Sequence, residues 1–450
     1  MTANRRTEIV ERFVLGNGLK VVVAPDHSSP LVGVAVVYNV GFRSEPEGRT
    51  GFAHLFEHLM FQGSAHLAKV EHVRLVEAAG GVFNGHTLAD LTAYYESLPS
   101  GSLELALFLE ADRMAAPAVT EENLRNQVAV VEEEVKVNVL NQPYGGFPWI
   151  VLPELAFDTY ENAHNGYGDF SHLEDATLED ATSFHASYYA PSNAILAVAG
   201  DCDPDEVHGL AERHFGPIPS APAPQRGPWP EPPLPADRRR VIDDALAPQP
   251  AFVVGYRTPD PVANLDSYLA YVVTASVLTD GEASRLRSRL IHRDHSVTDV
   301  GCHLGIFGID NFFMRDPVLF QVVVNHPGTA TTQQLLVAIE EELGRLAEHG
   351  PTPDELTRVA AVASSAYWRA LDSVMQRSIV LASLEVVHGR AGLASELPGR
   401  IAAVPSNEIA RAAANLASQH RALVEIRPVA AAASARRAPG ATGPRRSEER

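Results

Sequence analysis

Runs of apolar residues near the start of the chain predict strands that are followed by helices. Phe13–Pro25 reads as a hairpin that turns at Gly16-Asn17-Gly18, and Leu31–Val40 reads as a longer strand. Apolar positions then recur at helical spacing in several segments. These helical segments are Thr50–Gly63, Glu71–Ala79, Leu103–Met114 and Glu121–Leu140, and two further extended segments are Val82–Leu98 and Ala194–Ala199.

A proline-rich stretch divides this pattern into two halves. Proline recurs throughout Gly216–Pro235, which excludes a helix or a central strand and is typical of an inter-domain linker. After it the pattern starts again in a similar order, which suggests a duplicated α+β unit. The second half is predicted to contain a strand at Ala251–Tyr256, helices at Asp266–Thr279 and Gly281–Leu290, and strands near Val300 and at Val318–Val324.

The length of the chain agrees with more than one domain. A chain of 450 residues exceeds the usual size of a single domain. We therefore expect one domain over residues 1–216, a linker over residues 217–240 and a second, related domain over residues 241–429. Residues 430–450 are basic and of low complexity, and they are predicted to form a disordered tail.

Composition and charge narrow the classes of function. Hydrophobic residues make up 45% of the chain and charged residues 20%, as in an ordinary soluble protein. The formal net charge of −20 argues against a nucleic-acid partner, because phosphate binding needs a basic surface. Residues 1–14 lack the apolar segment of a signal peptide, and no apolar run is long enough to span a membrane. A cytoplasmic location is therefore expected.

The chain contains only two cysteines, Cys202 and Cys302, which lie far apart in the sequence. This count excludes a disulfide framework and a cysteine metal cluster. Any metal ion would therefore need histidine and carboxylate ligands.

The segment His54-Leu55-Phe56-Glu57-His58 carries the clearest chemical signal. Each residue of a helix turns by about 100°, so both histidines and Glu57 share one helical face. Two imidazoles one turn apart can chelate a zinc ion, and a carboxylate beside them can accept a proton from water. This H-x-x-E-H order is the inverzincin signature. The same spacing also occurs by chance, but burying these polar groups in an apolar helix favours a site.

A catalytic zinc ion also needs a third protein ligand. The predicted helix Glu121–Leu140 contains Glu132, Glu133 and Glu134 in succession. Since neighbouring helical residues project about 100° apart, at most one of the three faces the metal squarely. The pattern alone does not choose among them, and an ordinary acidic surface remains the alternative.

Four ordered motifs resemble those of the M16 metallopeptidases, the family of pitrilysin, insulysin and the mitochondrial processing peptidase. The resemblance extends over residues 8–428 and is strongest to bacterial half-length (M16B-type) subunits. The motifs are Gly51–Ser64 (GFAHLFEHLMFQGS), Gly80–Thr87 with Asp90, Thr92 and Tyr94, Val130–Glu134 leading to Asn141–Gly145, and Tyr189–Ala194 leading to Gly200-Asp201.

The resemblance implies a fold and a set of site residues. It implies two homologous α+β domains like those of LuxS and the mitochondrial processing peptidase, each a mostly antiparallel sheet covered by helices. It makes His54, His58 and Glu134 the ligands of one Zn²⁺ per chain, and Glu57 the general base. Peptide substrate would add to an edge strand formed by Asn84, Gly85, His86 and Thr87, although a purely structural role for this strand is an equal alternative.

Two departures from the family pattern affect the expected mechanism. Gln127 stands where relatives often carry a glutamate, and its amide can support the site only by hydrogen bonds. The Arg and Tyr that usually complete the active site would fall on Ile291 and Thr298, while Arg293 is out of register. We therefore expect a heterodimer (or heterotetramer) in which a second M16-type subunit supplies the Arg/Tyr pair, and a homodimer is the less favoured alternative.

The expected function is that of a zinc metalloendopeptidase that hydrolyses unfolded, leader or precursor peptides inside a closed chamber. The alternative is a non-catalytic scaffold subunit of a complex, but such subunits typically lose zinc ligands. His164 and His172 flank a loop around Tyr167 and could contact substrate, although the pattern does not favour this role. Neither the peptide substrate nor the partner's identity follows from the sequence.

Overall fold

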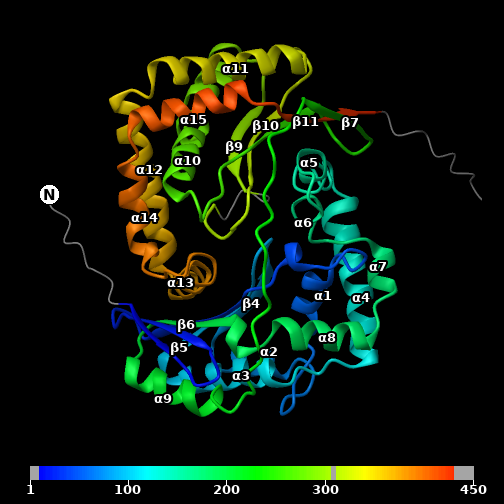
Figure 1. The fold of residues 1–450 in the computed structure, drawn as a ribbon, viewed down its shortest axis with the longest axis vertical. Helices are drawn as coiled ribbons and strands as arrows, with labels where there is room; N and C mark the ends of the chain where they lie inside the picture. Colours follow the sequence, from blue (N-terminus) through cyan, green and yellow to red (C-terminus); the bar gives the residue numbers. More distant parts are fainter. Residues whose placement is uncertain (1–9, 306–310, 430–450) are drawn as a thin grey trace, which may run out of the picture.

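The computed structural model describes residues 10–305 and 311–429, and it contains two mixed sheets covered by helices (Figure 1). The first sheet has the order β1-β2-β6-β3-β5-β4 and the second the order β7-β11-β8-β10-β9. Only β2–β6 and β7–β11 pair in parallel among the described strands. This architecture confirms the predicted α+β class with two mostly antiparallel sheets. The predicted tail, residues 430–450, lies outside the described residues.

The strands of the two sheets come from separate halves of the chain. The first sheet is built from β1 (Glu11–Val14), β2 (Lys20–Pro25), β3 (Leu31–Tyr38), β4 (Val82–Thr87), β5 (Thr92–Pro99) and β6 (Ala194–Gly200). The second sheet is built from β7 (Arg238–Asp244), β8 (Ala251–Arg257), β9 (Asp299–Leu304), β10 (Leu319–Asn325) and β11 (Ala422–Pro428).

The helices also divide into two groups along the chain. The first half contributes α1 (Phe52–Leu59), α2 (Glu71–Ala78), α3 (Leu103–Ala115), α4 (Glu121–Val135), α5 (Val151–Ala156), α6 (Tyr160–Ala163), α7 (Phe170–Glu174), α8 (Leu178–Tyr188) and α9 (Pro204–His214). The second half contributes α10 (Leu265–Thr279), α11 (Thr332–His349), α12 (Pro353–Asp372), α13 (Val374–His388), α14 (Leu393–Ala402) and α15 (Ser406–Ser418). In the part of the chain that the structure covers, no helix combines the length and the apolar character needed to cross a bilayer.

Two predicted elements differ in detail from the observed ones. Val82–Leu98 is not one extended segment, because the chain reverses between β4 and β5, where the amide of Leu88 donates to the carbonyl of Leu91 at 2.8 Å. The predicted helix at Gly281–Leu290 begins late. Gly281 adopts a left-handed φ of 76° that ends the preceding helix, and a π-helix then covers Arg287–Arg293.

Each sheet is covered on one face by a helix from the other half of the chain (Figure 1). Helix α13 packs on β3, β5 and β6, whereas α5 packs on β7, β8 and β11. Glycine permits both close approaches. A Cβ atom on Gly33 of β3 would lie 2.3 Å from the carbonyl oxygen of Val374, and one on Gly255 of β8 would lie 2.9 Å from Leu152.

The proline-rich segment between α9 and β7 contains no helix or strand, and β7 already begins at Arg238, inside the predicted linker range of 217–240. A buried ion-pair network holds this segment between the two halves. Asp90 pairs with Arg43 at 3.0 Å and with Arg226, which also pairs with Asp316 at 2.5 Å. Arg226 lies in the proline-rich segment and Asp316 in the second half, so the network joins all three parts of the chain.

Candidate metal centre

Helix α1 presents two imidazole rings on one face. Its other faces are apolar, and Phe52, Leu55 and Phe56 are buried in the core of the first half. The rings of His54 and His58 lie 5.0 Å apart between centroids, and their side chains remain 12% and 20% exposed. The helical spacing therefore places both histidines side by side, as the sequence predicts.

The carboxylate of Glu134 on α4 faces both rings. Its oxygens lie 3.6 Å from His54 Nε2 and 3.2 Å from His58 Nε2. The neighbouring glutamates turn away, since Glu132 pairs with Lys136 at 3.1 Å and Glu133 is exposed. Of these three glutamates, Glu134 is the one whose carboxylate faces both imidazole rings.

These three side chains fit a zinc ion. In a tetrahedral site with zinc bonds of ~2.0–2.1 Å, neighbouring ligand atoms lie about 3.3 Å apart. The imidazole–carboxylate distances of 3.6 and 3.2 Å, which run to the two different oxygens of Glu134, are close to that value, and single ligand atoms of all three residues lie within 4.8 Å of one another. Hydrogen bonds from His54 and His58 lower the pKa of Glu134, which keeps it in the anionic form that a cation needs.

Glu57 lies beside this group and does not contribute to it. The hydroxyl of Thr87 donates to Glu57 Oε2 at 2.7 Å. Burial raises the pKa of Glu57, while His54 and the hydrogen bond from Thr87 act in the opposite direction. A carboxyl group with a raised pKa next to a metal site is suited to accept and return a proton.

Strand β4 lies at the edge of its sheet and packs beside α1 (Figure 1). A Cβ atom on Gly85 would lie 3.3 Å from Cγ of Glu57, so the glycine leaves room for that side chain. Asn84 is exposed, and its side chain accepts a hydrogen bond from the amide of Gly85 at 2.8 Å. His86 lies against Tyr95, and burial lowers its pKa to about 4, so this imidazole is neutral at neutral pH.

Two other residues considered from the sequence, Gln127 and His172, occupy structural positions. Gln127 is buried, and its amide donates to the side chain of Asn126 at 2.9 Å. The ring of His172 lies 2.8 Å from the hydroxyl of Thr50. By contrast, Tyr167, which lies in the same loop region, packs edge-on against His54 with ring centroids 6.0 Å apart. No sequence pattern had singled out the ring of Tyr167 as a neighbour of the site.

The positions at which the family resemblance would place an Arg/Tyr pair are Ile291 and Thr298. Ile291 is half-buried in the π-helix, and the hydroxyl of Thr298 donates to the carbonyl of Asn325 at 3.0 Å. Arg293 is exposed and pairs with its neighbour Asp294 at 2.9 Å. Neither an arginine nor a tyrosine therefore stands at these two positions.

A second group of potential ligands lies deeper in the first half. Single donor atoms of His72, Glu96 and Glu110 lie within 4.8 Å of one another. Arg113 already pairs with Glu110 and brings a positive charge to the group. Burial also raises the pKa of Glu96 to about 8, so its carboxyl group is mainly neutral at pH 7. We therefore assign no metal to this group.

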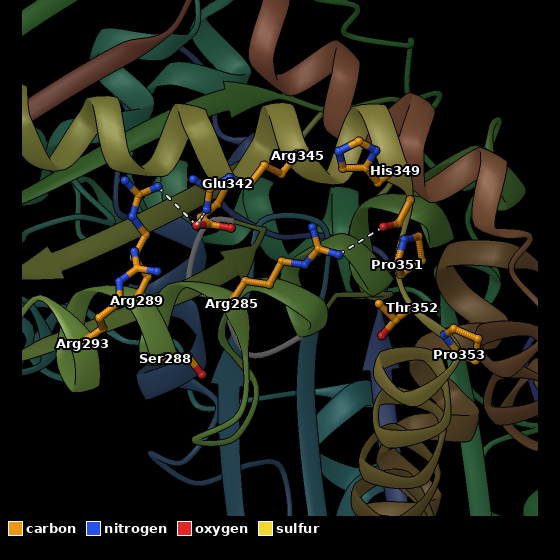
Figure 2. Close-up of a pocket in the computed structure, with 11 residues that line it drawn as sticks. Arg285, Ser288, Arg289, Arg293, Glu342, Arg345, His349, Pro351, Thr352 and Pro353 are labelled. Atoms are coloured by element: carbon orange, nitrogen blue, oxygen red, sulfur yellow. Dashed lines mark hydrogen bonds and ion pairs between the residues drawn. The ribbon is translucent and has the colours of Figure 1, made fainter.

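A basic pocket of about 810 Å³ lies in the second half, and no residue of the metal centre lines it (Figure 2). Arg289 and Arg293 of the π-helix, and Arg285 just before it, face Arg345 of α11 across the pocket. Most are already neutralised, since Arg285 pairs with Glu355 at 2.7 Å, and Arg289 and Arg345 share Glu342 at 3.2 and 2.7 Å. Internal ion pairs therefore occupy most of the arginines of this pocket, and we do not assign it as the active site.

Comparisons with known proteins identify the family and the fold of the chain. Residues 20–167 match the family described as "Insulinase (Peptidase family M16)", and residues 175–362 match "Peptidase M16 inactive domain". The zinc protease PqqE of Helicobacter pylori is 27% identical over 359 residues, which cover 78% of this chain and 77% of that protein. Subunit 1 of the human mitochondrial cytochrome b-c1 complex is 28% identical over 206 residues, 46% of this chain and 42% of that one. The crystal structure of a protease from Helicobacter pylori has the same fold, with a TM-score of 0.85 and 24% identity over 94% of this chain and 100% of that one.

Proposed function

The chain belongs to the M16 peptidase family, and from that premise we propose that it is a zinc-dependent endopeptidase with one zinc ion held by His54, His58 and Glu134. The observation that carries the proposal is the convergence of two imidazoles and one carboxylate at ligand spacing, with Glu57 next to them. A bound zinc ion would polarise the scissile carbonyl group and acidify the attacking water.

Residues of this chain would transfer the proton, position the general base and bind the peptide. Glu57 accepts the proton of the attacking water and returns it to the leaving amine. Thr87 holds the carboxylate in place through its 2.7 Å hydrogen bond. The free edge of β4 offers unpaired backbone groups to an extended peptide, which would bring its scissile bond next to the metal centre. This mode of binding favours unfolded peptides and flexible leader segments over folded proteins.

We further propose that a partner subunit completes the site. Hydrogen-bond donors that stabilise the oxyanion usually contribute a large part of the rate enhancement. This chain has Ile291 and Thr298 at the positions where an arginine and a tyrosine would supply such donors. A second M16-type subunit carrying that pair would supply the missing donors across the chamber, giving a heterodimer of one zinc-bearing and one donor-bearing chain.

A scaffold role is the second candidate, and the similarity to a subunit of the human cytochrome b-c1 complex favours it. Against it stands the complete set of ligands together with Glu57, which a scaffold would have no reason to keep in this geometry.

Cleavage of a mixed pool of fluorogenic peptides tests these proposals. The zinc-loaded chain is compared with the Glu57→Gln variant, and zinc content is measured by elemental analysis in both. We expect equal zinc content of one ion per chain and cleavage by the wild type only when a subunit with the Arg/Tyr pair is added. Cleavage by the chain alone would overturn the partner proposal, and absence of cleavage with the partner present would favour the scaffold role.

A further inference from the structure

The helix that carries both histidines is capped by a residue outside it. Helix α1 has only eight residues, and its N-cap residue, Gly51, has no side chain to cap it. Gly51 also adopts a left-handed φ of 86°, which disfavours the usual capping residues Ser, Thr and Asp. The carboxylate of Glu45 caps the helix instead, because it accepts hydrogen bonds from the amide of Gly51 at 2.9 Å and the amide of Ala53 at 2.8 Å. His54 directly follows Ala53, so the cap lies one residue from the metal centre.

His164 approaches the same carboxylate from the end of α6. Its Nε2 lies 3.3 Å from Glu45 and 2.6 Å from the carbonyl oxygen of Phe42. Its Nδ1 lies 2.8 Å from the carbonyl oxygen of Tyr160. Carbonyl oxygens only accept hydrogen bonds, so satisfying both requires a proton on each ring nitrogen, which makes the ring an imidazolium.

Both members of the pair are removed from solvent. The side chain of His164 is 9% exposed and that of Glu45 is fully buried. Burial alone would disfavour the charged ring, but the hydrogen bond and charge of Glu45, together with the two carbonyl groups, raise the pKa of His164. Burial also raises the pKa of Glu45, while His164 and the amides of Ala53 and Gly51 act in the opposite direction and favour the carboxylate. The ring is also fixed by stacking on Tyr160, with centroids 4.4 Å apart and an angle of 9° between planes.

We propose that Glu45 and His164 form a buried ion pair that positions helix α1, and that zinc affinity depends on this pair. The inference rests on the proposed zinc site but concerns two residues that do not contact the metal. A negative charge at a helix N-terminus stabilises the helix dipole and fixes its first turn. Since α1 makes only about two turns, a shift at its start changes the spacing between His54, His58 and Glu134.

The first test measures zinc affinity by competition with a chromogenic chelator. The variants are Glu45→Gln, His164→Gln and the double variant, and Leu210→Ala in α9 is the control for general loss of stability in the same half of the chain. We expect the zinc affinity of each single variant to fall about 10–100-fold, as is typical for residues that orient metal ligands without binding the metal. The double variant should lose little more than either single variant, because the two residues act as one unit. Losses no larger than that of Leu210→Ala, or fully additive losses, would overturn the proposal.

The second test does not depend on zinc. Nitrogen-15 NMR of histidine side chains in the zinc-free protein at pH 7.5 reports the protonation of each ring, and the His164→Gln variant assigns the signal. We expect both nitrogens of His164 to be protonated in the wild type and the ring to become neutral in Glu45→Gln. A neutral His164 in the wild type would overturn the ion pair even if zinc binds. Failure of the wild type to bind zinc, with the imidazolium present, would instead overturn the metal site.

Discussion

Glu96 gives a sharp test of how burial controls charge in the first half of the chain. This residue lies on β5 with no exposed surface, and neither carboxylate oxygen has a hydrogen-bond partner. The nearest basic atom, Nε2 of His72, lies 3.5 Å away, and burial lowers the pKa of His72 to about 4. Desolvation therefore dominates and raises the pKa of Glu96 from 4.5 to about 8. At neutral pH the carboxyl group is mainly protonated in the folded protein and ionised in the unfolded chain.

The consequence for stability has a definite sign and size. Between the two pKa values the folded state holds one more proton than the unfolded state, so the free energy of unfolding falls as the pH rises. The slope from this one group is about −1.4 kcal/mol per pH unit. Glu96→Gln removes the titration and keeps the shape of the side chain. Between pH 6.0 and 7.5, the free energy of unfolding of the variant should therefore rise by about 2 kcal/mol relative to that of the wild type.

Urea unfolding followed by circular dichroism measures this difference. The experiment uses zinc-free protein in EDTA, so that metal binding does not add its own pH dependence. Contributions from His72 are present in both proteins and largely cancel. The exposed residue Glu77 provides a matched control, since Glu77→Gln should follow the wild type at every pH. If the free energies of unfolding of Glu96→Gln and the wild type differ by the same amount from pH 6.0 to 7.5, Glu96 is ionised in the folded protein and the reasoning is wrong.

Three further predictions concern the site and its supports. Asp90→Asn should lower the free energy of unfolding by about 3–5 kcal/mol in urea titrations, because it leaves buried Arg43 without its counter-charge and leaves Arg226 with Asp316 alone; a loss below 1 kcal/mol would contradict the importance of this network. Thr87→Val removes the hydrogen bond to Glu57 and should lower kcat about tenfold with unchanged zinc content, whereas an unchanged kcat would show that Glu57 is held by other contacts. Gly33→Ala should lower the melting temperature and expose α13 to proteases, because the new Cβ would lie 2.3 Å from a backbone oxygen; Gly16→Ala, where a Cβ atom would meet no atom within 4 Å, tests whether loss of a glycine alone has that effect.

Much of the metal centre could be predicted because it depends on local geometry. His54, Glu57 and His58 share a face through the pitch of a single helix, which the sequence alone specifies. Glu134 could be reached only through family resemblance, because the choice among three consecutive glutamates depends on the rotation of α4 against α1. That rotation is set by packing of residues far apart in the sequence, such as Val131 and Leu55 in the same buried cluster.

The supports of the site could not be predicted for a related reason. Glu45 caps α1 across a turn, and no local capping pattern marks it, since the N-cap residue is a glycine. His164 reaches Glu45 from a helix more than a hundred residues further along the chain. The reversal between β4 and β5 could not be predicted either, because the alternation of residues continues through the turn, and Asp90 in the turn is held by a buried ion pair with Arg43, which is distant in the sequence.

The exchange of α5 and α13 between the two sheets imposes an order on biosynthesis. The last strand of the first sheet ends at Gly200, but the helix that covers its inner face ends at His388. A ribosome adding about 5–20 residues per second needs roughly 10–40 s to make the intervening segment. During that time α13 does not yet cover the apolar face of β3, β5 and β6. We therefore expect chaperones to bind the nascent chain before folding is complete. A truncation before α13 would make this transient state permanent.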